Sequence, residues 1–486
     1  MTELAFVSGM TENTLTVVIG IDVGTSGVRT MVASAAGAAL AELQAPLADS
    51  LADAFCHEQH PQDWWRAVCQ TVQGAVRQLK ASQEAPSVAG ITVTSTSGSL
   101  VLVDANGMPV RPAIIYDDVR SAAVAARLAE SYREINSSYS LAKAAWVREE
   151  EPAIWEKVRR ILHPGDWLTG KLTGAFETTD TSSALKLGFD LDTGQWAAPL
   201  SNLGLGEDVL PQVVTPGSRV GEVSKEASSE TGLPVGTPVF AGATDGMASL
   251  IASGASEAGH ASTTLGTTIV WKVLSRKKPR LGPGMYCHQH PSGMWAPGAA
   301  SNTGPGSFRK RPEGIAPEEM DQQAAQHLPS PTLCYVLGSR GERFPFLNPR
   351  AETFFEGEPQ SPAGWQAAQL QSLAFVERWG YERLEECGVE VGEEVFSTGA
   401  AAGSPVLSQL RANTLKRSVM RCQFPVAGFG AAILAATNGL YGGDLPAAIR
   451  GMAHVIEQIE PDRAECDRYE PIYQSFREAC SRRGYS

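Results

Sequence analysis

Two runs of apolar, largely β-branched residues flank a short glycine-rich segment near the start of the chain. The runs are 17–21 and 28–32, and the segment between them reads Asp-Val-Gly-Thr-Ser-Gly. β-Branched residues favour extended chain and glycines favour tight turns, so this pattern predicts a β-hairpin over residues 17–32. A turn with so little side-chain bulk lets its backbone N–H groups approach an anion closely. The alternative is an ordinary glycine-rich hairpin in which Asp22 caps the turn.

A similar pattern returns in the second half of the chain. Residues 261–265 and 269–271 are again extended in character, and Gly266-Thr267-Thr268 lies between them. This weak internal repeat predicts two similar α/β domains, each starting with a hairpin that holds phosphate. Two such hairpins facing one cleft would clamp a polyphosphate from both sides.

Helical periodicity is clearest after Pro61. Apolar residues recur at helical spacing as far as Lys80, which predicts a helix with one face toward the core. The pattern also predicts helical structure over 144–162, with a break at Pro152, and a long amphipathic helix over 365–387. A strand over 88–94 ends in a cluster of small polar residues.

Two predicted strands end in acidic residues that are candidates for substrate binding or catalysis. The strand predicted over 111–116 ends at Asp117-Asp118, with Arg120 nearby, an arrangement suited to binding sugar hydroxyls. Either acid is alternatively an N-cap for the alanine-rich helix expected over 121–130.

The second acidic strand end is Ala-Thr-Asp245-Gly, which follows an apolar strand and precedes a helix of small residues. A carboxylate near a helix N-terminus is favoured in its ionised form, as a general base requires. A capping role for Asp245 is the alternative. Asp22, at the end of the first strand, is expected to need a metal ion or ammonium group between itself and any phosphate.

Composition narrows the class of protein. A length of 486 residues predicts two or three domains, and the net charge of −13 argues against general nucleic-acid binding. No apolar run reaches the roughly 18–20 residues that span a bilayer. Residues 1–16 lack the features of a signal peptide and are expected to form a flexible tail of a cytoplasmic protein. The spacing of Cys56, His57 and His60 matches no common zinc motif.

Four motifs together resemble the FGGY carbohydrate kinases, and within them the D-ribulose kinase branch, which is also called xylulose-kinase-like. They are Ile-Asp22-x-Gly-Thr-Ser, Ala-Thr-Asp245-Gly, Leu-Gly266-Thr-Thr and Thr-Gly399 through Gly403. The resemblance implies an α/β fold of two ribonuclease-H-like domains, of the actin and hexokinase type, with an active-site cleft between them. It places an N-terminal domain for sugar and phosphate at 17–250 and a nucleotide-binding domain at 251–486.

The resemblance also implies ATP-dependent phosphorylation of a sugar hydroxyl with Mg²⁺, and D-ribulose as the substrate that yields D-ribulose 5-phosphate. Asp245 matches the catalytic base, and Asp22 matches the carboxylate that positions the metal ion and the hydroxyl. The remaining implied sites are the first phosphate loop (Gly24, Thr25, Ser26), the second (Gly266, Thr267, Thr268), the ATP site (Gly399, Ala400, Ser404) and sugar contacts (Asp22, Ser97, Asp118, Asp245).

Two departures from the family pattern bear on specificity. Xylulokinases carry a Met-His pair near the position of Ser97-Gly98, and its absence argues against D-xylulose as the preferred substrate. Ala400 and Ala401 stand where the family often has glycines, and their methyl groups are expected to narrow the adenosine pocket. The alternatives are a xylulokinase or another FGGY kinase of ketoses or polyols, and a non-catalytic sensor of sugar or nucleotide. Dimers are common in the family, so a homodimer is the assembly to test.

Overall fold

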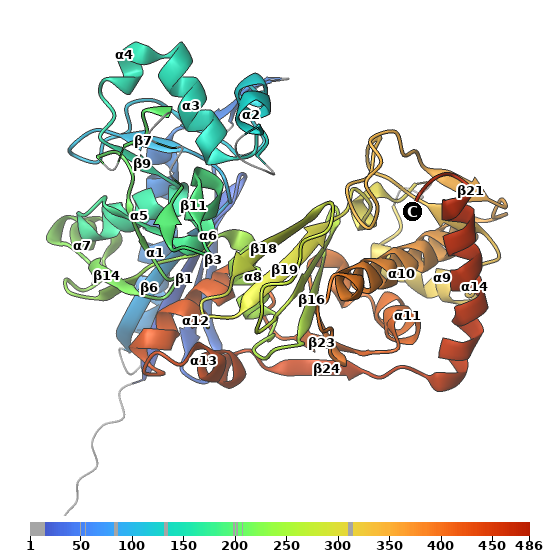
Figure 1. Ribbon diagram of the computed structural model, residues 1–486. Helices are drawn as coiled ribbons and strands as arrows, with labels where there is room; N and C mark the ends of the chain where they lie inside the picture. Colours follow the sequence, from blue (N-terminus) through green and yellow to red (C-terminus); the bar gives the residue numbers. More distant parts are fainter. Residues whose placement is uncertain are drawn as a thin grey trace, which may run out of the picture. The chain divides into compact units, whose positions relative to one another are not determined.

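The computed structural model describes residues 15–48, 50–53, 55–81, 86–130, 135–197, 200, 203–206, 208–309 and 314–486. Within it the chain forms two compact units (Figure 1). Unit 1 comprises Met1–Asp180, Pro199–Ala243 and Ala431–Gly443, and unit 2 comprises Thr181–Ala198, Thr244–Gly430 and Asp444–Ser486. Most of the tail expected over residues 1–16, as far as residue 14, lies outside the described residues.

A six-stranded sheet in the order β14-β15-β6-β1-β2-β3 forms the centre of unit 1 (Figure 1). β1 pairs antiparallel with β2 and parallel with β6, which is the arrangement of a hairpin followed by a crossover. Because β1 is covered on both faces, it reads as a continuous apolar run. The predicted hairpin is confirmed. The strands are β1 (Thr16–Val23), β2 (Gly27–Ser34), β3 (Ala39–Pro46), β6 (Ser87–Ser95), β14 (Arg219–Glu222) and β15 (Pro238–Phe240).

Helix α1 (Pro61–Ala81) covers the part of this sheet formed by β2 and β3. Its apolar stripe, including Val68 and Val72, is buried, as the helical periodicity predicted. The other helices of unit 1 are α2 (Ala122–Leu128), α3 (Ser140–Glu150), α4 (Pro152–Trp155), α5 (Pro164–Thr173) and α7 (Lys225–Thr231). Its short paired strands are β4 (Leu51–Ala52), β5 (His57–Gln59), β8 (Ala113–Ile114), β7 (Val101–Val103), β9 (Arg160–Leu162), β10 (Thr178–Asp180) and β13 (Gln212–Val214).

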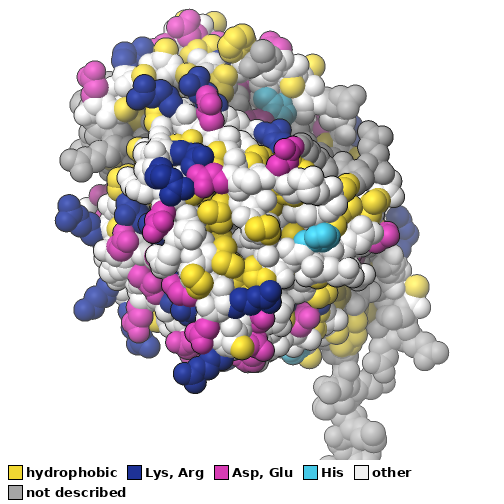
Figure 2. Space-filling view, turned by 90° about the vertical axis from the view of Figure 1, so that its right-hand side faces the viewer, with side chains coloured by type: hydrophobic (Ala, Val, Ile, Leu, Met, Phe, Trp, Pro, Cys, Tyr) yellow, Lys and Arg dark blue, Asp and Glu magenta, His cyan; other side chains and the backbone are white. Residues whose placement is uncertain are grey.

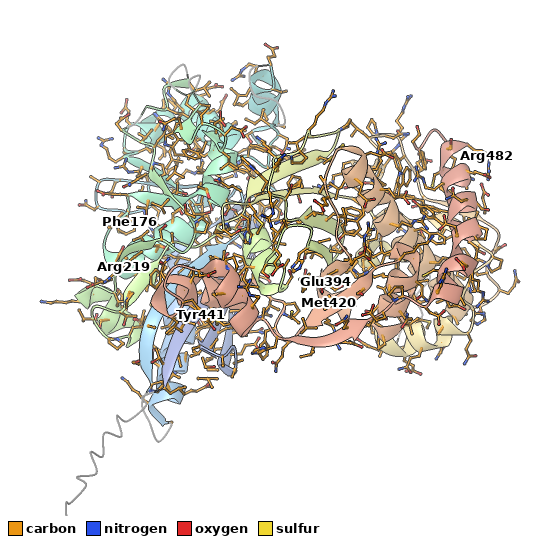
Figure 3. All side chains as sticks on the ribbon, turned by 60° about the horizontal axis from the view of Figure 1, so that its bottom comes forward. Phe176, Arg219, Glu394, Met420, Tyr441 and Arg482 are labelled. Carbon is orange, nitrogen blue, oxygen red and sulfur yellow. The ribbon has the colours of Figure 1, made fainter. Side chains whose placement is uncertain are left out.

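A segment from late in the sequence completes unit 1. Helix α12 (Ala427–Gly439) enters it, and the side-chain amide of Asn438 donates to the carbonyl of Gly217 at 2.7 Å. The hydroxyl of Tyr441, labelled in Figure 3, donates to the carbonyl of Ala35 at 2.6 Å. Unit 1 is therefore discontinuous in sequence.

Unit 2 has a seven-stranded sheet in the order β18-β19-β17-β16-β22-β23-β24. β16 pairs antiparallel with β17 and parallel with β22, and β22 pairs parallel with β23. The order β19-β17-β16-β22-β23 thus repeats β3-β2-β1-β6-β15 of unit 1, strand direction included, so the predicted internal repeat is confirmed. The strands are β16 (Ala261–Leu265), β17 (Ile269–Val273), β18 (Met285–Gln289), β19 (Trp295–Ala300), β22 (Glu394–Thr398), β23 (Ser418–Cys422) and β24 (Val455–Ile459).

Helix α10 (Pro362–Glu386) is the centre of the unit 2 core, between the sheet and the other helices. The predicted helix is confirmed, but several of its polar side chains are buried as well, and its exposed charged residues lie near its C-terminal end. On the face of the molecule seen in Figure 2, acidic and basic side chains are interspersed. Unit 2 also contains α6 (Thr181–Ala184), η1 (Leu185–Leu187), β11 (Phe189–Asp190), β12 (Gln195–Trp196), α8 (Asp245–Ala252), η3 (Pro305–Ser307), α9 (Pro317–Ala325), β20 (Leu333–Tyr335), β21 (Phe354–Glu356), η4 (Ala400–Gly403), α11 (Pro405–Leu415), α13 (Leu445–Met452) and α14 (Arg463–Ser481).

One expected element is partly wrong. The helical pattern over 144–162 ends with α4 at Trp155, and β9 follows. β9 pairs with β7, with Leu162 opposite Val101, so a tertiary strand pairing overrides the local helical preference. No helix among the described residues is long and apolar enough to cross a membrane.

Candidate active site

The turn between β1 and β2 presents backbone donors at the end of the unit 1 sheet. The N–H of Gly24 donates to the carbonyl of Gly27 at 3.0 Å, which closes the turn. The carbonyl of Thr25 is held by the side-chain amide of Gln59 at 2.7 Å. The N–H groups of Thr25 and Ser26 have no acceptor among the residues that the structure describes. The turn therefore has the free donors that an anion site requires.

Asp22 and Ser97 lie at the same edge of this sheet. Asp22 is the penultimate residue of β1 and pairs in register with Thr94 of the parallel strand β6, and Ser97 follows the end of β6. The described residues hold no cluster of three or more His, Cys, Asp or Glu side chains suited to a metal ion. A single half-buried carboxylate still fits Mg²⁺, which commonly takes only one or two carboxylates and completes its shell with water and substrate phosphates.

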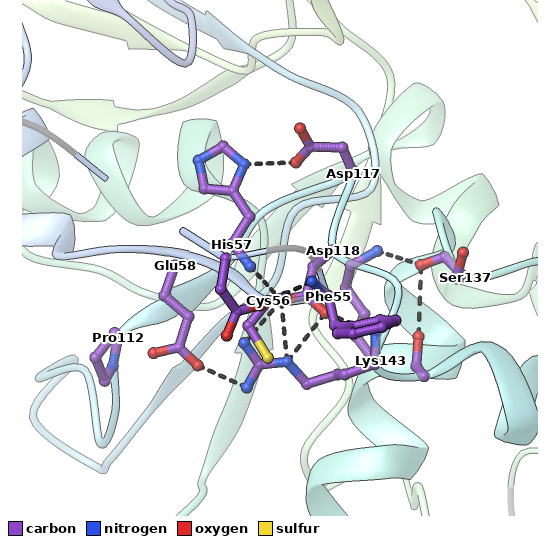
Figure 4. A network of polar contacts seen from close by, with 12 residues as sticks. Phe55, Cys56, His57, Glu58, Pro112, Asp117, Asp118, Ser137 and Lys143 are labelled. Atoms are coloured by element: carbon purple, nitrogen blue, oxygen red, sulfur yellow. Dashed lines mark hydrogen bonds and ion pairs between the residues drawn. The ribbon is translucent and has the colours of Figure 1, made fainter. Parts of the chain in front are cut away.

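The acidic pair after β8 belongs to a polar network in unit 1 (Figure 4). Asp118 is 1% exposed and accepts from the backbone N–H of His57 and from Nη2 of Arg120, both at 2.7 Å. Arg120 also pairs with Glu58 at 2.7 Å. Asp117, with a 48% exposed side chain, lies 2.7 Å from Nδ1 of His57.

The two neighbouring acids therefore differ in what they offer a ligand. Both carboxylate oxygens of Asp118 are engaged within the network, whereas Asp117 is open to solvent. Neither acid caps the helix that follows, because the N-cap of α2 is Ser121. The capping alternative is wrong, since the chain makes a further turn before the helix begins.

The turn between β16 and β17 repeats the first turn within unit 2. The N–H of Gly266 donates to the carbonyl of Thr268 at 3.2 Å, and the N–H groups of Thr267 and Thr268 have no acceptor within the described part of the chain. A second loop packs directly against this turn. A Cβ on Gly304 would lie 2.5 Å from the Thr267 carbonyl oxygen, and one on Gly306 would lie 2.8 Å from its side chain. Both positions therefore require glycine.

This turn borders a cavity of about 350 Å³ inside unit 2. That volume is typical of a site for a small molecule. Gly399 immediately precedes η4 and has a φ of +88°. A Cβ on Gly399 would lie 2.6 Å from the carbonyl oxygen of Leu265 at the end of β16, so the chain packs closely against that strand here. The cavity thus brings together two residues of the predicted second phosphate loop, Gly266 and Thr267, and two of the predicted ATP site, Ala400 and Ser404. The lining residues are Leu265, Gly266, Thr267, Pro305, Gly306, Phe308, Pro317, Glu318, Asp321, Leu370, Ala400, Ala401, Ser404 and Leu407.

Ser404 holds one wall of this cavity in place. Its hydroxyl oxygen accepts from the N–H of Leu407 at 3.2 Å, which caps helix α11, and its O–H donates to Asp321 at 2.6 Å. The other carboxylate oxygen of Asp321 accepts from the side chain of Gln366 at 2.6 Å. Asp321 was not predicted as a site residue, because it lies in an acidic helix with no motif to set it apart.

Asp245 is the first residue of α8, and Thr244 is its N-cap, so the capping alternative is wrong for Asp245. Its carboxylate accepts from the N–H of Gly246 at 2.6 Å. Burial raises the pKa of Asp245, and this hydrogen bond and the charges of Lys272 and Lys186 oppose the rise. The balance between the ionised and protonated forms of this carboxyl group therefore depends on these neighbours.

Neither Lys272 nor Lys186 was predicted from the sequence as a site residue. Lys186 lies on η1, and burial lowers its pKa while Asp245 opposes that change. Lys272 lies on β17 and is 7% exposed, and its ammonium donates to the carbonyl of Gly246 at 2.6 Å. A signal was present for Lys272, since it is the one charged residue in an otherwise apolar strand.

Comparison with known proteins agrees with this architecture. The N-terminal domain of the FGGY family of carbohydrate kinases matches residues 17–252, and its C-terminal domain matches 261–439. The xylulose kinase of Lactococcus lactis subsp. lactis is 25% identical, with 96% of each chain covered. That of Streptomyces rubiginosus is 28% identical, with 93% of this chain and 94% of the relative covered. The crystal structure of a xylulose kinase from Rhodospirillum rubrum superposes with a TM-score of 0.85 at 24% identity, covering 96% of this chain and 98% of that one.

Two ribonuclease-H-like units, each with a glycine-rich hairpin, define the actin and hexokinase class of phosphotransferase folds. Within this class, the chain belongs to the FGGY family of carbohydrate kinases, because the family's two domains match most of its length. The chain is therefore a sugar kinase.

Proposed function

We propose that this kinase transfers the γ-phosphoryl group of ATP to a hydroxyl of a pentulose, converting D-ribulose to D-ribulose 5-phosphate. Asp245 accepts the proton of the attacking hydroxyl, and Ser97 and Asp118 belong to the sugar site, where Asp117 is the more accessible carboxylate. Phosphoryl transfer depends on alignment and charge neutralisation more than on covalent help from the protein. The observation that carries the proposal is the half-buried carboxylate of Asp245 at a helix N-terminus, in the same unit as a cavity of about 350 Å³ that the second glycine-rich turn borders.

Each glycine-rich turn has a role in this proposal. The N–H groups of Thr25 and Ser26 in unit 1, and those of Thr267 and Thr268 in unit 2, donate to phosphate oxygens. Asp22 would hold Mg²⁺, which supplies positive charge to neutralise the phosphates when it is bound. The cavity bounded by Ala400 and the second turn takes the nucleoside.

D-Ribulose is preferred over D-xylulose because Ser97-Gly98 replaces the Met-His pair of xylulokinases. The similar proteins from Lactococcus lactis and Streptomyces rubiginosus are named xylulose kinases, so D-xylulose is the second candidate substrate. The test is ADP formation with ATP, Mg²⁺ and a panel of D-ribulose, D-xylulose, ribitol and other polyols. Preference for D-ribulose supports the proposal, and a higher kcat/KM for D-xylulose replaces it with the second candidate. Tight sugar or nucleotide binding without ADP formation would indicate a sensor.

A further inference from the structure

Lys272 is an unusual side chain for its position in the fold. It lies on β17 between Trp271 and Val273, two residues with no exposed surface, in the middle of the unit 2 sheet. No carboxylate in the described part of the chain lies within ion-pair distance of its ammonium. Burying an ammonium without a paired carboxylate costs several kcal/mol, so an apolar side chain of similar length would stabilise the strand better. A buried charge of this kind is a candidate for a functional role.

The surroundings of Lys272 are shaped to hold it. A Cβ on Gly298 of the neighbouring strand β19 would lie 3.2 Å from Cγ of Lys272, so this glycine makes room for the lysine stem. At the other end, Nζ donates to the carbonyl of Gly246 at 2.6 Å. A Cβ on Gly246 would lie 3.3 Å from Nζ, so the ammonium fits closely against the first turn of α8.

The contact with Gly246 connects Lys272 to Asp245. The carboxylate of Asp245 accepts from the N–H of Gly246, and the ammonium of Lys272 binds the carbonyl of the same residue. The lysine therefore fixes the peptide segment that carries the carboxylate and places a positive charge beside it. The other titratable groups that interact with Lys272 or Asp245 are Lys186 on η1, His288 on β18 and His290 just beyond it.

The two histidines do not replace this charge. Burial, reinforced by the charges of Lys272 and Lys186, lowers the pKa of His288 to about 3. Burial and Lys272 lower the pKa of His290 to about 3 as well. Both imidazoles are neutral near pH 7, so the positive charges that act on Asp245 within unit 2 come from the two lysines.

We propose that Lys272 is a positioning residue for the catalytic base: by holding the Gly246 carbonyl and placing its ammonium beside Asp245, it fixes the orientation and the ionised state of that carboxylate. The inference rests on the proposed function, in which Asp245 accepts the proton of the sugar hydroxyl. Loss of the ammonium would favour the protonated carboxyl, so the acid limb of the kcat/KM profile moves to higher pH.

The test compares Lys272→Met, which removes the charge and shortens the side chain by one heavy atom, with Lys272→Arg, which keeps the charge. Lys277→Met is the matched control, because Lys277 is an exposed lysine just beyond the same strand. For Lys272→Met we expect kcat to fall. We also expect the loss of kcat/KM relative to wild type to be about tenfold larger at the acid end of the pH profile than on its plateau. We expect Lys272→Arg to restore the wild-type acid limb and the control to match wild type throughout.

An unchanged acid limb in Lys272→Met overturns the proposal, as does a loss confined to KM for the sugar, which would indicate a substrate contact. A turnover-independent measurement separates this inference from the proposed function. In protein labelled with ¹³C at the aspartate carboxyl groups, the Asp245 resonance is assigned by difference from Asp245→Asn. Its titration is expected to move to higher pH in Lys272→Met even if no sugar supports ADP formation, and an unmoved titration refutes the role. Absence of sugar-dependent ADP formation by the wild type refutes the proposed function alone.

Discussion

The ion pair between Arg411 and Glu377 permits a quantitative test of what holds the nucleotide cavity in place. Arg411 on α11 meets Glu377 on α10 with two contacts of 2.6 and 2.7 Å, and both side chains have no exposed surface. Arg411 also donates to Ser397 of β22 at 2.6 Å, and Thr263 of β16 donates to Glu377 at 2.6 Å. The pair thus connects two helices to the two parallel strands whose ends border the cavity.

Replacing Arg411 with Met leaves the Glu377 carboxylate buried without its partner. We expect the free energy of unfolding of unit 2 to fall by about 3–5 kcal/mol, since an uncompensated buried charge costs that much. For a unit of this size, that loss corresponds to a Tm lower by about 10 °C. Calorimetry measures the Tm, and steady-state kinetics at a permissive temperature is expected to show a raised KM for ATP.

Two further variants make this prediction specific. Arg411→Met combined with Glu377→Leu removes both charges and is expected to recover most of the lost stability, because the carboxylate is no longer stranded. Arg383→Met removes a partner of the exposed pair with Glu386 on the same helix, and is expected to change stability by no more than about 0.5 kcal/mol. The reasoning is refuted if Arg411→Met unfolds within about 1 kcal/mol of wild type, or if the double variant is less stable than the single one.

Three other changes have defined expected outcomes. Gly399→Ala places a methyl group against the Leu265 carbonyl in a left-handed backbone conformation, so ATP binding measured by calorimetry should weaken at least about tenfold. Ser404→Ala removes a helix cap and a hydrogen bond to buried Asp321, which should lower the free energy of unfolding by about 1–2 kcal/mol in urea titrations; an unchanged midpoint would contradict this role. Burial lowers the pKa of Lys272 to about 8, so between about pH 8 and 10 the unfolded chain binds a proton that the folded chain has released. Stability therefore rises with pH in that window, and wild type should gain about 3 kcal/mol relative to Lys272→Met between pH 8 and 10.5, whereas a pH-independent difference would be the contrary result.

The hydrophobic pattern predicted the elements whose residues lie close together along the chain. The two hairpins follow from β-branched runs around glycine, and the first helix follows from its apolar stripe. The segment 144–162 was predicted less well, because the pairing of Leu162 with Val101 joins residues far apart in the sequence. The polar face of α10 did not reveal its burial, since polar residues such as Glu377 are satisfied inside the core by distant partners.

The same distinction holds for the candidate site. Gly266, Thr267, Ala400 and Ser404 were predicted from motifs, and the structure gathers them around one cavity. The engagement of Asp118 with Arg120 was not predictable, because the sequence shows that the groups are near one another but not which oxygen atoms are occupied. The sequence places a charge inside an apolar strand at Lys272, but its contact with Gly246 depends on the packing of β17 against α8.

The most direct test of the account is sugar-dependent ADP formation by wild type and Asp245→Asn, with sugar and ATP binding measured on both proteins. The account predicts turnover by wild type with D-ribulose, a loss of at least about a hundredfold in kcat for Asp245→Asn, and ligand affinities that change little. Turnover by the variant at the wild-type rate would contradict the role of Asp245 as the base.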